Sequence, residues 1–154
     1  MPNFQRIHHI GIPVSSIERS LPWYRDVFGL LENKTAKASG DEISTALEVP
    51  GAELTVVFLS VGEQLLLELL EYASPRGEAF DRRNCDVGAV HVCFEVDDID
   101  AAYEQLTELG VRFNHPPIRL GEGLGDLSGY AFAYFRDPDG IQLELFELPV
   151  GARN

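Results

Sequence analysis

The sequence predicts an α+β fold built from two copies of one β-α-β-β-β module. The main observation is an internal repeat, in which the segment beginning at His9 matches the segment beginning at His91, 82 positions later. A second observation is that strand-like and helix-like hydrophobic patterns follow one another in the same order in both copies. The 154 residues, 45% of them hydrophobic, suffice to build the cores of one domain or two small modules.

The first module is expected over residues 5–72. Residues 7–14 are patterned as a strand, Ser15-Ser16 offers a helix N-cap, and Gly29 suits the C-cap of the amphipathic helix that follows. Three further strands are expected at 43–49, 53–60 and 64–72.

The second module is expected over residues 90–149, after a linker at 73–89. Its first strand is predicted at 90–96, Asp97-Asp98 offers the N-cap, and a helix leads to a glycine as in the first module. Its remaining strands are expected at 111–114, 131–136 and 141–147, with a hairpin turn at 137–140.

Four side chains are candidates for a metal site. His9 and His91 occupy equivalent positions in the repeat, and Glu68 and Glu144 lie at equivalent positions in the apolar closing strands. A single strand histidine or glutamate is usually an ordinary core or surface residue, but this pair occurs twice. An ionised carboxylate in an apolar strand is costly unless it is paired or binds a cation. Two imidazoles and two carboxylates suit one divalent ion, either Zn, Ni, Co, Mn or Fe.

Neighbouring polar residues are assigned other roles. His8 is expected to point away from His9 because side chains alternate along a strand. By the same alternation, Glu71 and Glu147 are expected to point outward from the closing strands. His115 is interpreted as a loop residue. The glycine-rich segment 121–129 is expected to be a flexible connection, with a lid as the alternative.

Charge excludes two classes of function. Asp and Glu number 25 against 12 Lys and Arg, a net charge of −13, which opposes binding to nucleic acid or to an anionic membrane surface. An anionic substrate would need local cations, for which the candidates are Arg76, Arg82, Arg83 and Arg119. The two cysteines show no disulfide pattern, and neither a signal peptide nor an apolar run of about 20 residues occurs, so a cytoplasmic location is expected.

Several segments carry a resemblance to a known superfamily. They are His9–Val14, Tyr24–Leu30, Leu67–Glu71, Val90–Ile99 and Tyr134–Glu147. In this order and at these separations, the chain resembles the vicinal oxygen chelate superfamily over roughly residues 5–149. That superfamily includes glyoxalase I, methylmalonyl-CoA epimerase, extradiol ring-cleaving dioxygenases, and fosfomycin- and bleomycin-resistance proteins.

The resemblance implies paired βαβββ modules that form an open, cup-shaped mixed sheet around one divalent metal. By motif position, the ligands would be His9, Glu68, His91 and Glu144. The implied enzyme is a metal-dependent lyase, isomerase or epimerase that removes a proton next to a metal-bound carbonyl through an enediolate or enolate. We expect Glu144 to alternate between ligand and base, with Glu68 as the second candidate for this role.

The sequence leaves the chemistry open among relatives. A fourth ligand at Glu68 resembles the ligand set of glyoxalase I, whereas the sequence around Glu68 resembles that of the epimerases. The alternatives are an Fe(II)-dependent ring-cleaving dioxygenase and a non-catalytic small-molecule binding protein of the resistance type. The expected substrate is a small carbonyl compound or thioester, and a homodimer is expected from the family.

Overall fold

The computed structural model describes residues 3, 5–61, 65–79, 81 and 83–152. The chain divides into two compact units, Met1–Ala79 and Phe80–Asn154, and each is described by itself. Each unit has one mixed sheet and helices that follow its first strand, so the predicted α+β class is confirmed.

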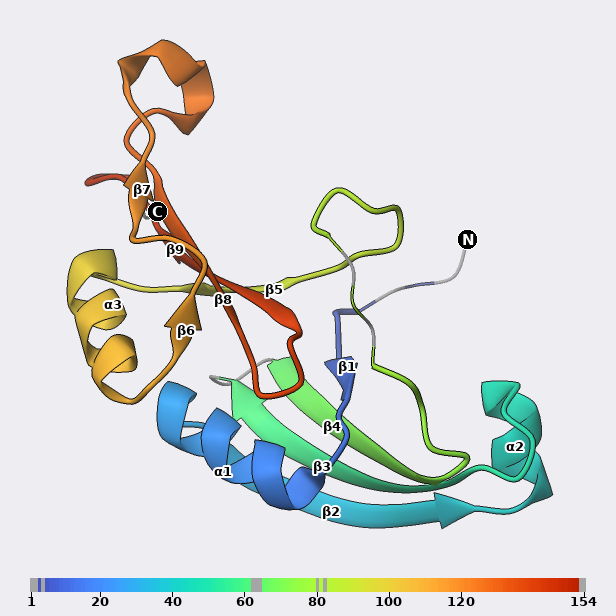
Figure 1. Cartoon of the computed structure of the whole chain (residues 1–154). Helices are drawn as coiled ribbons and strands as arrows, with labels where there is room; N and C mark the ends of the chain where they lie inside the picture. Colours follow the sequence, from blue (N-terminus) through green and yellow to red (C-terminus); the bar gives the residue numbers. More distant parts are fainter. Residues whose placement is uncertain (1–2, 4, 62–64, 80, 82, 153–154) are drawn as a thin grey trace. The chain divides into compact units, whose positions relative to one another are not determined.

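The first unit contains a four-stranded sheet in the order β1-β4-β3-β2 (Figure 1). Strand β1 runs parallel to β4, and the other neighbouring strands are antiparallel. The elements are β1 (His9–Pro13), α1 (Ile17–Phe28), β2 (Leu31–Ser39), α2 (Asp41–Leu47), β3 (Glu53–Val61) and β4 (Leu65–Ser74).

Helix α1 covers one face of this sheet and defines the core of the unit. It begins after Ser16, whose side chain accepts a hydrogen bond from the Arg19 amide, and ends at Gly29 in the left-handed conformation (φ 63°). The helix packs on β3 and β4. Leu67 and Leu69 are fully buried on this face, so Glu68 between them projects from the other face of β4.

Two elements of the first unit differ from the expectation. The strand expected at 43–49 is wrong, because Asp41–Leu47 forms the short helix α2, whose first turn carries two acidic residues that favour a helix N-terminus. The missing strand is β2, over Leu31–Ser39, which is mostly polar and contains one β-branched residue. Strand β2 lies at the edge of the sheet, where its backbone pairs with β3. This backbone pairing outweighs the weak strand propensity of the β2 residues.

The second unit contains a five-stranded sheet in which β5-β9-β8-β6 are successive neighbours and β7 also pairs with β8. Strand β5 runs parallel to β9, as β1 does to β4. The elements are β5 (Val92–Glu95), α3 (Ile99–Glu108), β6 (Arg112–Phe113), β7 (Ile118–Arg119), a 3-10 helix (Glu122–Leu127), β8 (Ala131–Arg136) and β9 (Gln142–Glu147).

Helix α3 repeats the role of α1. Asp98 caps it by accepting a hydrogen bond from the Ala101 amide at 3.0 Å. The helix packs on β8 and β9, where Phe135 and Leu143 are fully buried. The segment 121–129, expected to be a flexible connection, contains two short 3-10 turns that meet at a kink at Leu124 and Gly125. Within the described part of the chain, no helix is both long enough and apolar enough to cross a bilayer.

Candidate metal centre

The first candidate pair lies on the face of the first sheet that α1 leaves uncovered. His9 begins β1 and Glu68 lies in the neighbouring strand β4, where it is in register with Gly11. His9 Nε2 lies 3.3 Å from Glu68 Oε2. The fold therefore brings together the two first-module residues that the repeat singled out.

His8 does not lie on the opposite face, as strand alternation had suggested. It precedes β1, which begins at His9, and its Nδ1 lies 2.8 Å from His9 Nδ1. Hydrogen bonding at Nδ1 leaves His9 Nε2 directed at Glu68, the arrangement in which a second-layer partner orients a ligand imidazole. The prediction for His8 was wrong because strand alternation begins only where the strand begins.

The second candidate pair lies in the second unit. His91 immediately precedes β5, and Glu144 is in β9, where it is in register with Cys93. His91 Nε2 lies 2.9 Å from Glu144 Oε2. Glu144 is buried, with 10% of its side chain exposed, against 15% for Glu68.

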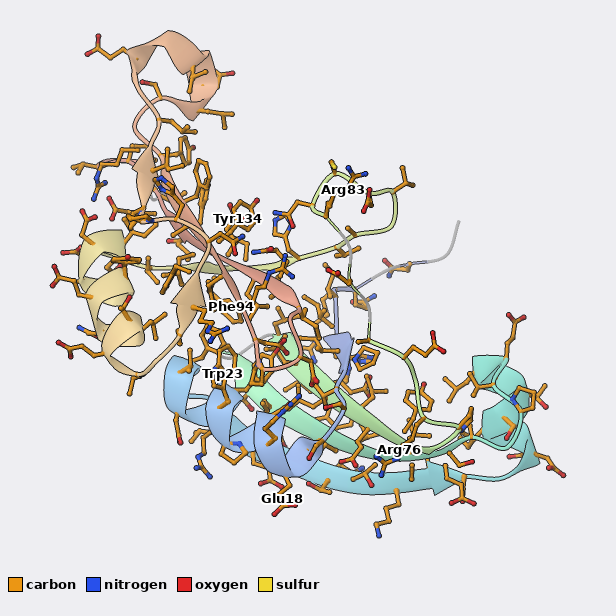
Figure 2. The ribbon with its side chains drawn as sticks, viewed as in Figure 1. Glu18, Trp23, Arg76, Arg83, Phe94 and Tyr134 are labelled. Carbon is orange, nitrogen blue, oxygen red and sulfur yellow. The ribbon has the colours of Figure 1, made fainter. Side chains whose placement is uncertain are left out.

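The surroundings of the two carboxylates differ at matching positions. Phe58 stands opposite Glu68 on β3, and Tyr134 stands opposite Glu144 on β8. Figure 2 shows Tyr134 among the side chains of the second sheet. Burial together with the charge of the Glu144 carboxylate raises the pKa of Tyr134 to about 12.

Cys93 also belongs to the surroundings of Glu144. Loss of hydration, followed by the charge of Glu144, raises the pKa of the Cys93 thiol to about 12. The matching residue beside Glu68 is Gly11, where an added Cβ would lie 3.4 Å from Glu68 Oε2. Cys93 is therefore a protonated thiol at neutral pH.

These neighbours were missed by the sequence reasoning, although the repeat contains the information. Gly11 and Cys93 each follow the repeat histidine by two positions, and Phe58 and Tyr134 each precede the repeat glutamate by ten. Aligning the neighbouring strands, and not only the candidate histidines and glutamates, would have found them.

Glu71 and Glu147 do not point outward into solvent, which corrects the prediction for both. Glu71 Oε2 accepts a hydrogen bond of 2.8 Å from the Ile17 amide, and Glu147 Oε2 accepts one of 2.7 Å from the Ile99 amide. These amides belong to the first residues of α1 and α3 and have no partner within the helix. Both carboxylates are therefore helix caps supplied by a neighbouring strand.

The donor atoms of the two pairs fit a divalent cation of the predicted kind. Each pair offers one imidazole nitrogen and one carboxylate oxygen from adjacent elements, and no thiolate. Taken separately, neither unit gathers three or more His, Cys, Asp or Glu side chains into a metal cluster among its described residues. Each unit therefore offers one imidazole nitrogen and one carboxylate oxygen close together.

Two of the four arginines considered as anion anchors are engaged elsewhere. Arg83 pairs with Asp86, and Arg119 donates to Glu147 and to Asp100. Arg76 is exposed, and Arg82 lies outside the described residues. His115 is an exposed loop residue, as predicted, with its ring Nδ1 2.8 Å from the carbonyl oxygen of the next residue.

Comparisons with known proteins agree on the family. The model of the Glyoxalase/Bleomycin resistance protein/Dioxygenase superfamily matches residues 6–145. A 2-epi-5-epi-valiolone epimerase from Actinomyces sp. is 33% identical, with 99% of this chain and 84% of the relative covered. The mitochondrial methylmalonyl-CoA epimerase of Homo sapiens is 27% identical, with 93% and 74% covered. A glyoxalase family protein from Bacillus cereus has the same fold, with a TM-score of 0.75, 22% identity and 95% of both chains covered.

Proposed function

Because the chain belongs to the Glyoxalase/Bleomycin resistance protein/Dioxygenase superfamily, we propose that it is a metal-dependent epimerase acting at a carbon next to a carbonyl. The family identification carries the expectation of carbonyl chemistry. The choice of epimerisation is supported by two relatives whose names state this reaction. A small-molecule substrate follows from the same relatives.

The repeated His–Glu pair is the observation that carries the metal dependence. We propose His9, Glu68, His91 and Glu144 as the ligands of one divalent cation. In both units the histidine nitrogen already lies 2.9–3.3 Å from the carboxylate oxygen, on the face away from the helix. Two carboxylates balance the charge of a divalent ion, which relieves the cost of holding them in apolar strands.

The histidines and glutamates of this chain then have different roles in the proposed reaction. A bound divalent cation would polarise a substrate carbonyl and make the neighbouring C–H bond more acidic. Imidazole at neutral pH serves as a steady ligand, whereas a carboxylate can turn from the cation and accept a proton. We propose that Glu68 or Glu144 takes the proton from the substrate carbon. The C–H electron pair passes to the carbonyl oxygen as an enolate, and a proton returning on the opposite face gives the epimer.

Metal analysis followed by NMR in heavy water tests this proposal. Three carbonyl probes cover the relatives: a cyclic polyhydroxy ketone, a 2-methyl-branched acyl-CoA thioester, and the adduct of a 2-oxoaldehyde with a thiol. We expect the purified protein to retain about one divalent ion per chain. Deuterium should enter one probe beside its carbonyl, stop entering after chelation, and enter again when Zn²⁺, Co²⁺ or Mn²⁺ is restored. Deuterium exchange that continues unchanged after chelation would overturn the proposed metal dependence.

The same experiment separates the alternatives. Rearrangement of the oxoaldehyde adduct to a thioester would identify a lyase of the glyoxalase type. Oxygen consumption with a catechol and Fe²⁺ would identify a dioxygenase. Tight binding of a probe without exchange would identify a binding protein. Each of these results would replace the epimerase proposal.

Single substitutions identify the proton acceptor. Glu68→Gln and Glu144→Gln each replace a carboxylate by an amide of the same shape, and Glu104→Gln on the exposed face of α3 is the matched control. The variant that lacks the base should lose deuterium exchange by at least about a hundredfold. The control should match the wild type in both metal content and exchange.

A further inference from the structure

Two histidine side chains that follow one another in the sequence meet at the start of β1. His8 Nδ1 lies 2.8 Å from His9 Nδ1, and the two rings stand nearly perpendicular, with centroids 5.1 Å apart. His8 precedes β1, yet its carbonyl oxygen accepts a hydrogen bond of 3.2 Å from the Leu66 amide of β4. The backbone that carries His8 is therefore held against the same strand that carries Glu68.

The contact between the two rings requires one nitrogen to carry a proton and the other to offer a lone pair. A histidine binds a cation through an unprotonated nitrogen. His9 Nε2 is the nitrogen that faces Glu68, at 3.3 Å, so Nε2 must be unprotonated when a cation is bound there. Neutral His9 then carries its proton on Nδ1 and donates a hydrogen bond to His8 Nδ1. The opposite direction, from His8 to His9, would leave the proton of neutral His9 on Nε2 and block cation binding.

The second unit has no counterpart of His8. Val90 occupies the position before His91, and its side chain cannot accept a hydrogen bond. Among the described residues, the polar contact of the His91 ring is with Glu144, 2.9 Å from Nε2. The corresponding distance between His9 and Glu68 is 3.3 Å. The unit whose carboxylate lies further from its histidine is thus the unit that gives this histidine a second polar contact.

The remaining ring contact of His9 among the described residues is with Phe58. The Phe58 ring stands edge-on to His9, with the centroids 5.9 Å apart. A phenyl ring has no lone pair or N–H, so it cannot select which imidazole nitrogen is protonated. Burial does not lock the ring either, because 41% of the His9 side chain is exposed. The orientation and protonation of His9 therefore depend on its two polar neighbours, His8 and Glu68.

We infer that His8 is a positioning residue of the proposed metal site: its Nδ1 accepts a hydrogen bond from His9 Nδ1 and so presents His9 Nε2 to the cation. The inference rests on the proposed function, because it requires His9 to be a ligand. It gives His8 no direct contact with the cation or the substrate. Loss of a partner that orients a ligand imidazole typically lowers metal affinity by about 10- to 100-fold.

Three substitutions of His8 identify the atom that acts. The side-chain oxygen of asparagine is as many bonds from Cα as histidine Nδ1, so His8→Asn keeps an acceptor at the required distance along the side chain. His8→Gln places the amide oxygen one bond further out, at the level of Nε2, and His8→Leu removes the acceptor. His115→Asn, at an exposed histidine of the other unit, is the matched control.

Three measurements on the full chain follow the site without relying on activity. Competition between the metal-free protein and a chromophoric chelator gives the Zn²⁺ affinity. The visible spectrum of the Co²⁺ form reports the arrangement of the ligands. Nitrogen NMR of isotope-labelled histidines in the Zn²⁺ form shows which ring nitrogens carry protons.

The variants should differ according to where they place an acceptor. His8→Leu and His8→Gln should weaken Zn²⁺ binding by about tenfold or more and alter the Co²⁺ spectrum. His8→Asn should retain most of the wild-type affinity, and His115→Asn should match the wild type. In the Zn²⁺ form of the wild type, His9 should be protonated on Nδ1, and His8 Nδ1 should be unprotonated.

The outcomes separate this inference from the proposed function. A wild-type protein that binds no Zn²⁺, or that binds it equally well after His9→Ala, would overturn the proposed ligand set and the inference together. Binding that is lost in His9→Ala but unchanged in all three His8 variants would overturn the inference alone. Affinity that is restored by His8→Gln rather than by His8→Asn would do the same, because His8 would then act through Nε2. A His8 that is protonated on Nδ1 in the wild-type Zn²⁺ form would also overturn it, and that measurement needs no variant to fold.

Discussion

Removing the Glu147 carboxylate should destabilise the protein through α3 rather than through the proposed metal site. Glu147 Oε2 accepts a hydrogen bond of 2.7 Å from the Ile99 amide, and Ile99 is fully buried. A hydrogen bond to a charged group contributes about 1.5–3 kcal/mol, and the charge at the helix N-terminus adds about 0.3–1 kcal/mol. Part of this is recovered by water in the variant, because 15% of the Glu147 side chain is exposed. We therefore expect Glu147→Ala to lower the free energy of unfolding by about 2 kcal/mol.

Calorimetry and urea unfolding measure this loss. For a chain of this length, about 2 kcal/mol corresponds to a fall in Tm of roughly 4–8 °C. Glu147→Gln keeps an acceptor oxygen and removes only the charge, so its loss should be about half as large. Glu104→Ala, which removes an exposed carboxylate from the same helix, is the control. A fall in Tm of less than about 1 °C for Glu147→Ala, or one equal to that of the control, would refute the capping role.

Two further predictions concern single positions. Gly29→Ala should lower the free energy of unfolding in urea by about 1–2 kcal/mol, because Gly29 has a φ of 63°, and an unchanged midpoint would argue against strain there. In the metal-free protein at pH 8, Cys93 should be alkylated far more slowly than Cys85, although both are exposed, because a pKa of about 12 leaves about one thiolate in 10⁴; equal rates by mass spectrometry would exclude that pKa.

The raised pKa of Cys93 also fixes the direction of a pH effect. The folded state favours the protonated thiol, so this contribution to stability is fully present below pH 9 and is lost as the pH rises toward 12. Wild-type unfolding in urea should therefore become easier across this alkaline range. Cys93→Ser should show a smaller dependence on pH there.

The sequence predicted those parts of the fold that hydrophobic pattern and local hydrogen bonding determine. Ser16 and Asp98 cap the helices as expected, because a short polar side chain before an amphipathic stretch has few other roles. Strand β2 was missed because its stability comes from pairing with β3. The strand propensity of its own residues does not include this pairing. The same limit applies to His8, whose direction depends on where β1 begins.

The candidate site was predicted only in part, for a related reason. The pairs His9–Glu68 and His91–Glu144 could be read from the repeat because both members have unusual chemistry for their strands. Tyr134 was missed, because a tyrosine in a strand is ordinary unless the strands beside the candidate residues are aligned as well. The register that places Tyr134 opposite Glu144 is set by the pairing of β8 with β9 in the folded protein.

One strand in each unit links the proposed site to the packing of the helix. Glu68 and Glu71 lie three residues apart on β4, and Glu144 and Glu147 lie three apart on β9, so each pair uses opposite faces. One member faces its histidine, and the other caps the helix that covers the sheet. A slip of either strand by one residue would exchange these faces, and would break the cap and the His–Glu pair together. The capped helix therefore fixes the register that brings each carboxylate to its histidine, which explains why acidic residues three apart recur in an otherwise apolar strand.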